Sequence, residues 1–400
     1  MENHEIIKWI RKLLYAEYYT DFQIEIEGES SSRHGASSRI IFAKIIITDG
    51  KSREVLHIAV KFSKPALRLL PAIRAAYRKE IRFYETVANV IEELQTDVEG
   101  PFVGLSKCYD TFADSTTEII VLENLRYKGY KLHRVDLPMS LPYIELVLTN
   151  FAKFHALCFA LKEKNRRLFD ELAETFKADV DIIVEMDDFF KTKPAVVVQN
   201  LRDSNRKDLA DELEKLIAPG VANMVKSIVT DKVDNVVIAH FDCHCNNFMF
   251  KFEGTDEGTP TNVAILDWQL AKMHSPAIDV SYFLHTVCSK QELDRENELL
   301  KYYHDQLGNF LTKLDCNVDI SFPYTTFLEH WKKYRFYGFS FACCFMDFNF
   351  LDENSFPKFD DANENNNVGK IMSETVLKNP TLYRQRLVDL VEHYLRKPNN

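Results

Sequence analysis

The sequence has no unbroken apolar stretch of about 18 residues or more, the length a helix needs to cross a bilayer. A membrane-spanning helix is therefore not expected. The first residues, MENHEIIKWIRKLL, mix charged and apolar side chains and lack the uncharged core of a secretory signal. Neither insertion into a membrane nor export is predicted from these features.

Cysteine is also sparse. The chain has eight cysteines, and only Cys243 with Cys245 and Cys343 with Cys344 lie close together in the sequence. Small secreted proteins held by disulfides show a denser spacing. The spacing here predicts reduced thiols and, with them, a cytoplasmic location.

An excess of positive charge is missing as well. The chain has 60 acidic and 50 basic residues, which gives a formal net charge of -10. Because nucleic-acid binding depends on Lys and Arg that neutralise phosphates, no nucleic-acid partner is expected. At 400 residues the chain is long enough for a large core divided into two lobes or domains. Nothing in the composition predicts an oligomeric state.

The most informative stretch runs from residue 236 to residue 269. It contains two apolar runs, 248–252 and 263–266, separated by the turn-forming segment EGTDEGTPT. This pattern predicts a β-hairpin, in which the start of the first strand lies beside the end of the second. Asn247 and Asp267 are therefore expected to be neighbours.

The loop before this hairpin, HFDCHCNN, adds a third polar side chain, Asp242. A carboxylate that accepts a proton, together with an Asn and an Asp that hold Mg²⁺, is what phosphoryl transfer requires. In this interpretation Asp242 orients and deprotonates a hydroxyl group. Asn247 and Asp267 supply oxygen ligands that hold Mg²⁺ against the phosphates of ATP.

The same loop allows a second interpretation, a zinc hydrolase. Its metal ligands would come from His240, Asp242, Cys243, His244 and Cys245. Zinc sites recruit a second, distant ligand cluster, such as CxxC or HExxH. Neither motif occurs elsewhere in the chain, so phosphoryl transfer is the favoured interpretation.

The N-terminal part is expected to contain a helix at 5–19 and strands at 22–27, 40–47 and 55–62. A loop of small residues, GESSSRHGASS at 28–38, joins the first two strands. Its backbone N–H groups could contact phosphates, but it has only two glycines, and a solvated hairpin loop fits equally well.

A helix is predicted at 72–88, with Glu80 on its apolar stripe. A carboxylate that faces the core needs a partner, because burying it alone is costly. Lys61, on the preceding strand, is the expected partner. Kinases use such a pair to position the lysine that contacts the α- and β-phosphates. The alternative is a Glu80 at the rim of the stripe with a solvated carboxylate.

An apolar strand at 119–122 ends in Glu123, Asn124 and Leu125, after which long helical patterns begin. A hinge between two lobes is predicted at this point.

Two further polar residues lie in the helical part. His155, on the apolar face of a helix that begins near Pro142, is predicted to be a hydrogen-bonded packing residue. Asp279 either braces the loop at Asp242 through backbone hydrogen bonds or caps the helix that follows it.

Taken together, these segments resemble the ecdysteroid kinase-like family of arthropods, a relative of choline kinases and aminoglycoside phosphotransferases. The resemblance extends from about Gly28 to Phe345. It rests on HIAVKF around Lys61, KEIRFYE with Glu80, VLENL at 121–125, FAKFHAL at 151–157, HFDCHCNN at 240–247, ILDWQ at 265–269 and SPAIDVSYFL at 275–284.

The resemblance implies an α+β, bilobal protein-kinase-like fold, with a small β-rich N-lobe at 1–125 and a larger helical C-lobe at 126–400. ATP and Mg²⁺ would lie between the lobes. The adenine would lie against the segment Glu123, Asn124 and Leu125, and Lys61, fixed by Glu80, would hold the phosphates.

The implied reaction transfers phosphate from ATP to a hydroxyl of a lipophilic alcohol, such as an ecdysteroid or a plant-derived or xenobiotic alcohol. A choline or aminoglycoside kinase and a non-catalytic nucleotide binder are the alternatives. Three departures from the family pattern bear on this choice. Phe241 replaces the glycine of His-Gly-Asp, His244 stands where the family often has an aromatic residue, and the 28–38 loop lacks a Gly-x-Asn-Tyr-like pattern. All three leave the base, the metal ligands and the Lys–Glu pair in place, so activity is expected.

Aromatic residues are concentrated between 327 and 350. One set has helical spacing and is expected in the core: Phe327, Trp331, Tyr334, Phe341 and Phe345. A second set lies off this stripe and is predicted to wall a ligand cleft: Phe336, Tyr337, Phe339, Phe348 and Phe350. The nearest acidic residues that could bind a cationic acceptor are Asp347 and Asp352.

Overall fold

The computed structural model describes residues 7–12, 22–30, 38–49, 52–64, 67–253, 258–351 and 376–396. The helix predicted at 5–19 is helical over 7–12, and its other residues lie outside the described part. Residues 31–37 of the small-residue loop and Asp352 also lie outside it.

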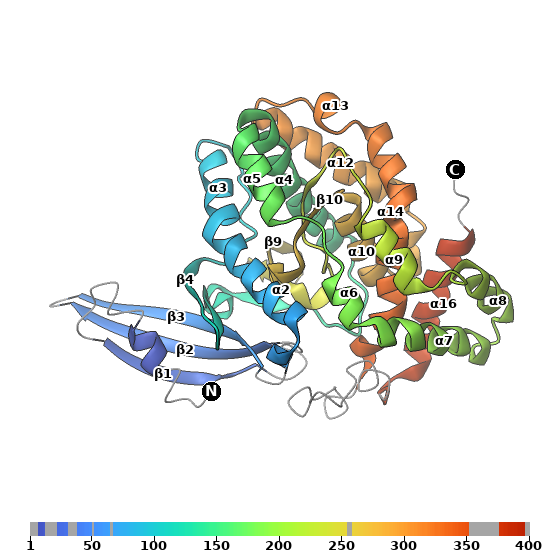
Figure 1. Ribbon diagram of the computed structural model, residues 1–400, viewed down its shortest axis with the longest axis horizontal. Coiled ribbons are helices and arrows are strands. Elements are labelled where there is room, and N and C mark those ends of the chain that lie inside the picture. The colour runs from blue at the N-terminus through green and yellow to red at the C-terminus, as the bar shows by residue number, and fades with distance from the viewer. Residues whose placement is uncertain are drawn as a thin grey trace.

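The N-terminal part is an antiparallel sheet of five strands in the order β1-β2-β3-β5-β4 (Figure 1). The strands are β1 Phe22–Glu29, β2 Ser38–Asp49, β3 Ser52–Ser63, β4 Cys108–Ala113 and β5 Glu118–Glu123. Along β3, Ile58, Val60 and Phe62 are buried in a core on one face of the sheet. Because side chains alternate along a strand, Lys61 points to the other face.

The helix predicted at 72–88 is longer than expected. It consists of α2 (Pro71–Arg82), a π-helical turn (Phe83–Val87) and α3 (Ala88–Leu94) in succession. In the turn, Phe83 stacks on Trp268 with ring centroids 4.1 Å apart. This contact ties the helix that follows β3 to the C-terminal part of the molecule.

Most of the remaining described chain is helical (Figure 1). The helices are α4 Leu141–Lys164, α5 Arg166–Thr175, α6 Asp181–Glu185, α7 Asp187–Asp203, α8 Lys207–Leu216, α9 Val221–Val229, α10 Ala277–Val287, α11 Lys290–Leu293, α12 Glu296–Lys313, α13 Val318–Ser321, α14 Tyr324–Phe345 and α16 Pro380–Arg396. Short 3₁₀ segments are η2 Leu67–Leu69, η4 Leu125–Lys128, η5 Cys245–Asn247, η6 Trp268–Leu270 and η7 Met346–Phe350.

Two small sheets lie among these helices. One pairs β7 (Val237–Ala239) with β10 (Lys272–His274), and the other joins β6 (Tyr130–Leu132), β8 (Phe248–Phe252) and β9 (Pro260–Ile265). β8 and β9 form the predicted hairpin. The predicted α+β architecture, a small β-rich lobe and a larger helical lobe, is confirmed. The boundary at residue 125 stays a prediction.

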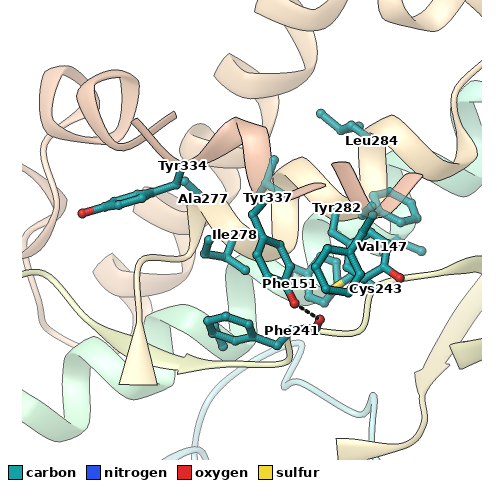
Figure 2. Packing of buried hydrophobic residues seen from close by; sticks show 14 of the residues in the cluster. Val147, Phe151, Phe241, Cys243, Ala277, Ile278, Tyr282, Leu284, Tyr334 and Tyr337 are labelled. Atoms are coloured by element: carbon teal, nitrogen blue, oxygen red, sulfur yellow. Dashed lines mark hydrogen bonds between the residues drawn. The ribbon is translucent and has the colours of Figure 1, made fainter. Parts of the chain in front are cut away.

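A glycine sets the distance between α10 and α14. A Cβ atom at Gly338 would lie 2.3 Å from the backbone carbon of Ser281 and 2.3 Å from the nitrogen of Tyr282. Only glycine allows this approach. It brings Tyr337 of α14 and Tyr282 of α10 against the loop that follows β7 (Figure 2).

One helix in the described ranges, α4, is long and apolar enough to cross a membrane. Its most apolar 18-residue window is 78% buried in the structure, as in the core helix of a folded domain. Phe151 of α4 packs against Phe248 and Phe283, with ring centroids 5.8 and 6.0 Å away. No membrane-spanning helix was expected from the sequence, because polar residues interrupt the apolar run of α4.

Candidate active site

The loop that follows β7 is held from behind by Asp279 of α10. Oδ2 accepts a hydrogen bond from the His240 N–H at 2.7 Å, and Oδ1 accepts one from the Phe241 N–H at 2.9 Å. Of the two roles predicted for Asp279, bracing this loop is therefore the right one. Burial alone would raise the pKa of the Asp279 carboxyl group, but hydrogen bonds and the nearby histidines lower it.

His155 completes this brace. The residue is fully buried, with Nε2 3.2 Å from Asp279 Oδ2 and Nδ1 2.8 Å from the Tyr303 hydroxyl. The prediction of a hydrogen-bonded packing histidine is confirmed.

Phe241 has a left-handed backbone, with φ of +68°. This conformation costs a residue other than glycine about 1–2 kcal/mol. Here packing offsets the cost. The Phe241 ring lies 5.2 Å from Tyr337 and 5.6 Å from His274, and the Phe241 carbonyl accepts a hydrogen bond of 2.9 Å from the Tyr337 hydroxyl (Figure 2).

Three donors surround the Asp242 carboxylate. Asn247 Nδ2 lies 3.2 Å from Oδ2, His244 Nε2 lies 3.5 Å from Oδ2, and the Tyr282 hydroxyl lies 3.5 Å from Oδ1. Burial raises the pKa of Asp242, but His244, His240 and Asn247 together lower it below its usual value. Asp242 is therefore an ionised carboxylate in a fixed orientation.

The hairpin brings Asn247 and Asp267 together as predicted. The Leu266 N–H, next to Asp267, donates to the Asn247 carbonyl at 2.8 Å. The Asn247 amide nitrogen donates to the Asp242 carbonyl at 2.8 Å, so the amide oxygen is the atom that can bind a metal. Asp267 itself has a left-handed backbone, with φ of +64°.

Lys61 forms ion pairs with two carboxylates. Its Nζ lies 2.6 Å from Glu80 Oε2 and 2.7 Å from Asp267 Oδ1. Burial lowers the pKa of Lys61, but the two carboxylates outweigh this effect and raise it. Burial raises the pKa of Glu80 to about 7, and the negative charge of Asp267 adds to this effect, although Lys61 opposes it. The predicted Lys61–Glu80 contact is present, and the rim position for Glu80 is excluded, since its side chain is 1% exposed.

One cavity of about 430 Å³ is lined by all the residues predicted to act as base, to bind nucleotide or to bind metal. Its lining includes Lys61, Glu80, Glu123, Asn124, Leu125, Asp242, Asn247 and Asp267. The lining comes from β3, α2, the end of β5, the loop after β7 and the end of the hairpin. Side chains more than 200 positions apart thus face the same space.

The segment predicted as a hinge is fixed by backbone contacts. The Glu123 N–H donates to the Lys107 carbonyl and the Asn124 N–H to the His57 carbonyl, each at 2.8 Å. The Ser106 hydroxyl, which also lines the cavity, donates to the Glu123 carbonyl at 3.1 Å. Sequence reasoning missed Ser106, because a single serine in an irregular segment carries no signal.

At the other end of the cavity the aromatic prediction was only partly right. Phe348 lines the cavity, and so do Phe341 and Phe345 from the stripe expected in the core. The other four off-stripe residues are buried in the core: Phe336, Tyr337, Phe339 and Phe350. The first three lie on α14, which contacts α7, α9, α10 and α16, so neighbouring helices cover it on several sides. Phe350, in η7, packs against Tyr383 of α16 with ring centroids 6.0 Å apart.

Asp347 is not available to a cationic acceptor. Its carboxylate is 7% exposed and pairs with Lys193 of α7. The remaining predicted acidic residue, Asp352, lies outside the described residues.

The zinc interpretation does not fit the geometry. Nε2 of His240 lies 2.8 Å from the Leu266 carbonyl, and Nδ1 accepts the Asp242 N–H at 3.1 Å, so both ring nitrogens are engaged. Within the described ranges, no three residues among His, Cys, Asp and Glu gather as they would around a metal ion.

Tyr282 is a further residue that sequence reasoning missed. It lies three positions after Asp279 on α10, so the same helix face braces the loop and reaches Asp242. That spacing was a usable signal.

The fold and the cavity define a bilobal, kinase-like protein. A protein-family model described as the ecdysteroid kinase-like family matches residues 22–316, more than half of the chain. The chain belongs to the ecdysteroid kinase-like family, and with it to small-molecule kinase-like proteins.

Two other comparisons complete the picture. A search of curated proteins gave no match. Among solved structures, a point mutant of aminoglycoside 2'-phosphotransferase IIIa in complex with GDP is similar, with 12% identity and a TM-score of 0.41, over 84% of this chain and 87% of that one. At this TM-score the likeness assigns neither fold nor activity.

Proposed function

We propose that the chain is an ATP-dependent phosphotransferase that phosphorylates a hydroxyl group of a lipophilic alcohol, such as an ecdysteroid or a plant-derived or xenobiotic alcohol. The observation that supports this most directly is the meeting of the Lys61–Glu80 pair with Asp242, Asn247 and Asp267 at one cavity. Phosphoryl transfer depends on positioning and charge stabilisation, and these five side chains can supply both.

The donor set fits Mg²⁺. Hard cations prefer oxygen ligands, and Asp267 and Asn247 offer a carboxylate and an amide oxygen. Lys61 contacts both Glu80 and Asp267, so Lys61 keeps a partner in Glu80 if Asp267 binds the metal. When bound, Mg²⁺ neutralises charge on the phosphates of ATP.

The protein side chains have separate tasks in this proposal. Asp242 accepts a hydrogen bond from the acceptor hydroxyl. It takes up the proton as the hydroxyl oxygen attacks the γ-phosphorus of ATP, while the bond from this phosphorus to the bridging oxygen breaks and ADP leaves. Asn247 and Tyr282 hold the carboxylate in orientation. Lys61 binds the α- and β-phosphates, and Glu80 keeps its ammonium group in place. Asp267 would hold the metal together with Asn247.

The two ends of the cavity suit two different ligands. The segment Glu123–Leu125 lines the end of the cavity that we assign to adenine. Phe341, Phe345 and Phe348 form an apolar wall that suits the body of a sterol or a phenolic compound. Asp347 is paired with Lys193, so its charge is not offered to a choline or aminoglycoside acceptor.

A competition assay tests the acceptor class. Purified protein with Mg·ATP is offered a hydroxylated sterol, a phenolic glycoside, choline and kanamycin. We expect a higher kcat/KM for the sterol or the phenolic glycoside than for the two cations. A clear preference for choline or kanamycin would reject the apolar acceptor, and nucleotide binding without transfer to any alcohol would favour a non-catalytic role.

We also propose a cytoplasmic location. All eight cysteines are free, which is typical of a reducing compartment.

A further inference from the structure

Asp179 lies where three separate parts of the molecule meet. Its Oδ2 is 2.5 Å from Lys79 Nζ of α2, and its Oδ1 is 3.3 Å from Lys272 Nζ of β10. Oδ1 also accepts the Asp181 N–H, at the start of α6, at 3.4 Å. None of Lys79, Asp179 and Lys272 lines the cavity, so the proposed chemistry does not use them directly.

The link to α2 leads to the Lys61–Glu80 pair. Lys79 immediately precedes Glu80 in α2, so a displacement of Lys79 also displaces Glu80. Glu80 is the buried partner of Lys61, at 2.6 Å. The position of Asp179 therefore bears on where the phosphate-binding lysine is held.

The link to β10 leads to the loop that carries Asp242. Lys272 pairs with Ala239, the residue before His240, and its Nζ lies 5.5 Å from the ring centroid of Phe241. Lys272 also donates to the Asp179 carbonyl at 2.6 Å. Lys272 thus connects Asp179 to the loop that carries Asp242.

The link to α6 leads to a wall of the cavity. Ile182 and Glu185 of α6 and the following Met186 line the cavity. Asp179 accepts a backbone hydrogen bond from the first residue of this helix. A ligand that shifts α6 therefore also shifts Asp179, the residue that pairs with Lys79.

We propose that Asp179 is a positioning residue that couples the α6 wall of the cavity to the Lys61–Glu80 pair. The inference rests on the proposed function, because it assumes that nucleotide binds beside Lys61. Nucleotide binding orders α6, and a ligand on the α6 wall favours the placement of α2 in which Glu80 holds Lys61. Such coupling is reciprocal, so each side strengthens binding on the other by the same factor.

The charges at Asp179 are consistent with this role. Burial would raise the pKa of Asp179, but Lys272 and Lys79 lower it, so the carboxylate is ionised. Burial lowers the pKa of Lys272 to about 8, even though Asp179 opposes this effect. One carboxylate thus compensates two ammonium groups, and removing its charge loosens both links.

Hydrogen exchange with the non-hydrolysable nucleotide Mg·AMP-PNP tests the coupling without a known acceptor. The amides of α6, residues 181–186, are compared with and without nucleotide in the parent, in Asp179→Asn and in Lys79→Gln. Lys79→Gln is needed because Asp179→Asn leaves Lys272 without its charge partner and can impair folding. Lys191→Gln is the control, since Lys191 forms an equally short, 2.5 Å ion pair with Asp187 within α7, and its side chain is 66% exposed.

We expect nucleotide to slow exchange in α6 about fivefold in the parent and in Lys191→Gln, and to have little effect in the other two variants. Mg·AMP-PNP should also bind about fivefold more weakly to Asp179→Asn and Lys79→Gln, and the double variant should be no worse than either single one. Unchanged protection of α6 in a folded Lys79→Gln variant would overturn the coupling and leave the proposed function standing. If the parent does not bind Mg·AMP-PNP at all, the proposed function fails, and the coupling fails with it.

Discussion

At the scale of single residues, the site depends on charges that are buried and compensated. Lys61 is the clearest case, because its ammonium group contacts both Glu80 and Asp267 and is almost completely shielded from water. Removing one member of such a cluster leaves another charge uncompensated, which costs more than the pair itself contributes.

The variants Lys61→Met and Glu80→Gln test whether these two groups act as one unit. Each should lower turnover, and the double variant should cost much less than the sum of the two effects. Steady-state kinetics on the four proteins provides the measurement. Strictly additive losses would show that the contact has no functional weight.

His244 gives the site a pH-dependent contribution to stability. Burial lowers the pKa of His244, but the charge and the hydrogen bond of Asp242 oppose this effect. The net result is a pKa raised from an ordinary 6.5 to about 10. The folded protein therefore binds this proton more tightly than the unfolded chain does. The stabilisation is fully present below about pH 6.5 and is lost as the pH rises toward 10.

Urea unfolding at pH 6.5 and pH 9.5 measures this contribution. The parent should lose more stability between the two pH values than His244→Gln, which keeps a hydrogen-bond donor but has no charge to lose. Equal losses in the two proteins would mean that the Asp242–His244 contact does not hold the proton.

At the scale of elements, the hairpin and the α10–α14 contact assemble the site. The hairpin was predictable because its strands are close in sequence and its turn residues are explicit.

Asp267→Ala should abolish the Mg²⁺-dependent tightening of ATP binding, and Asn247→Ala should weaken it less, because a neutral amide attracts the ion less strongly. Calorimetric titration with and without Mg²⁺ measures both, and parent-like binding in both variants would refute the assignment of the metal ligands.

The α10–α14 contact was not predictable, because Gly338 looks unremarkable in a helical sequence. We expect Gly338→Ala to lower the free energy of unfolding by about 1–3 kcal/mol, since the new methyl group overpacks the contact, and to lower turnover by moving Tyr282 and Tyr337. Gly308→Ala on α12 is a matched control. Its new Cβ would meet only a Val318 methyl group at 3.2 Å, so a smaller loss is expected. Equal losses, measured by urea unfolding, would show that the close approach is not limiting.

At the scale of the whole molecule, local sequence patterns predicted the helices and strands. Packing between residues that are distant in sequence determined which side chains meet. The Lys61–Glu80 pair could be foreseen because a carboxylate on an apolar stripe demands a partner. The contacts of Asp179 with Lys79 and Lys272 could not be foreseen, because roughly a hundred positions separate the partners and no periodicity connects them. The aromatic residues of α14 were misassigned for a related reason: helical spacing does not show that other helices cover a helix on several sides.

The central claim is that Asp242 serves as the base for phosphate transfer from ATP to an alcohol. The most direct test measures ADP formation with a hydroxylated sterol or phenolic glycoside acceptor, in the parent and in Asp242→Asn, alongside Mg·ATP affinity. We expect Asp242→Asn to bind Mg·ATP as the parent does and to turn over about 10²–10⁴-fold more slowly, the usual contribution of a general base. A turnover rate of Asp242→Asn within about threefold of the parent rate would contradict the claim, because the expected loss is at least about 10²-fold.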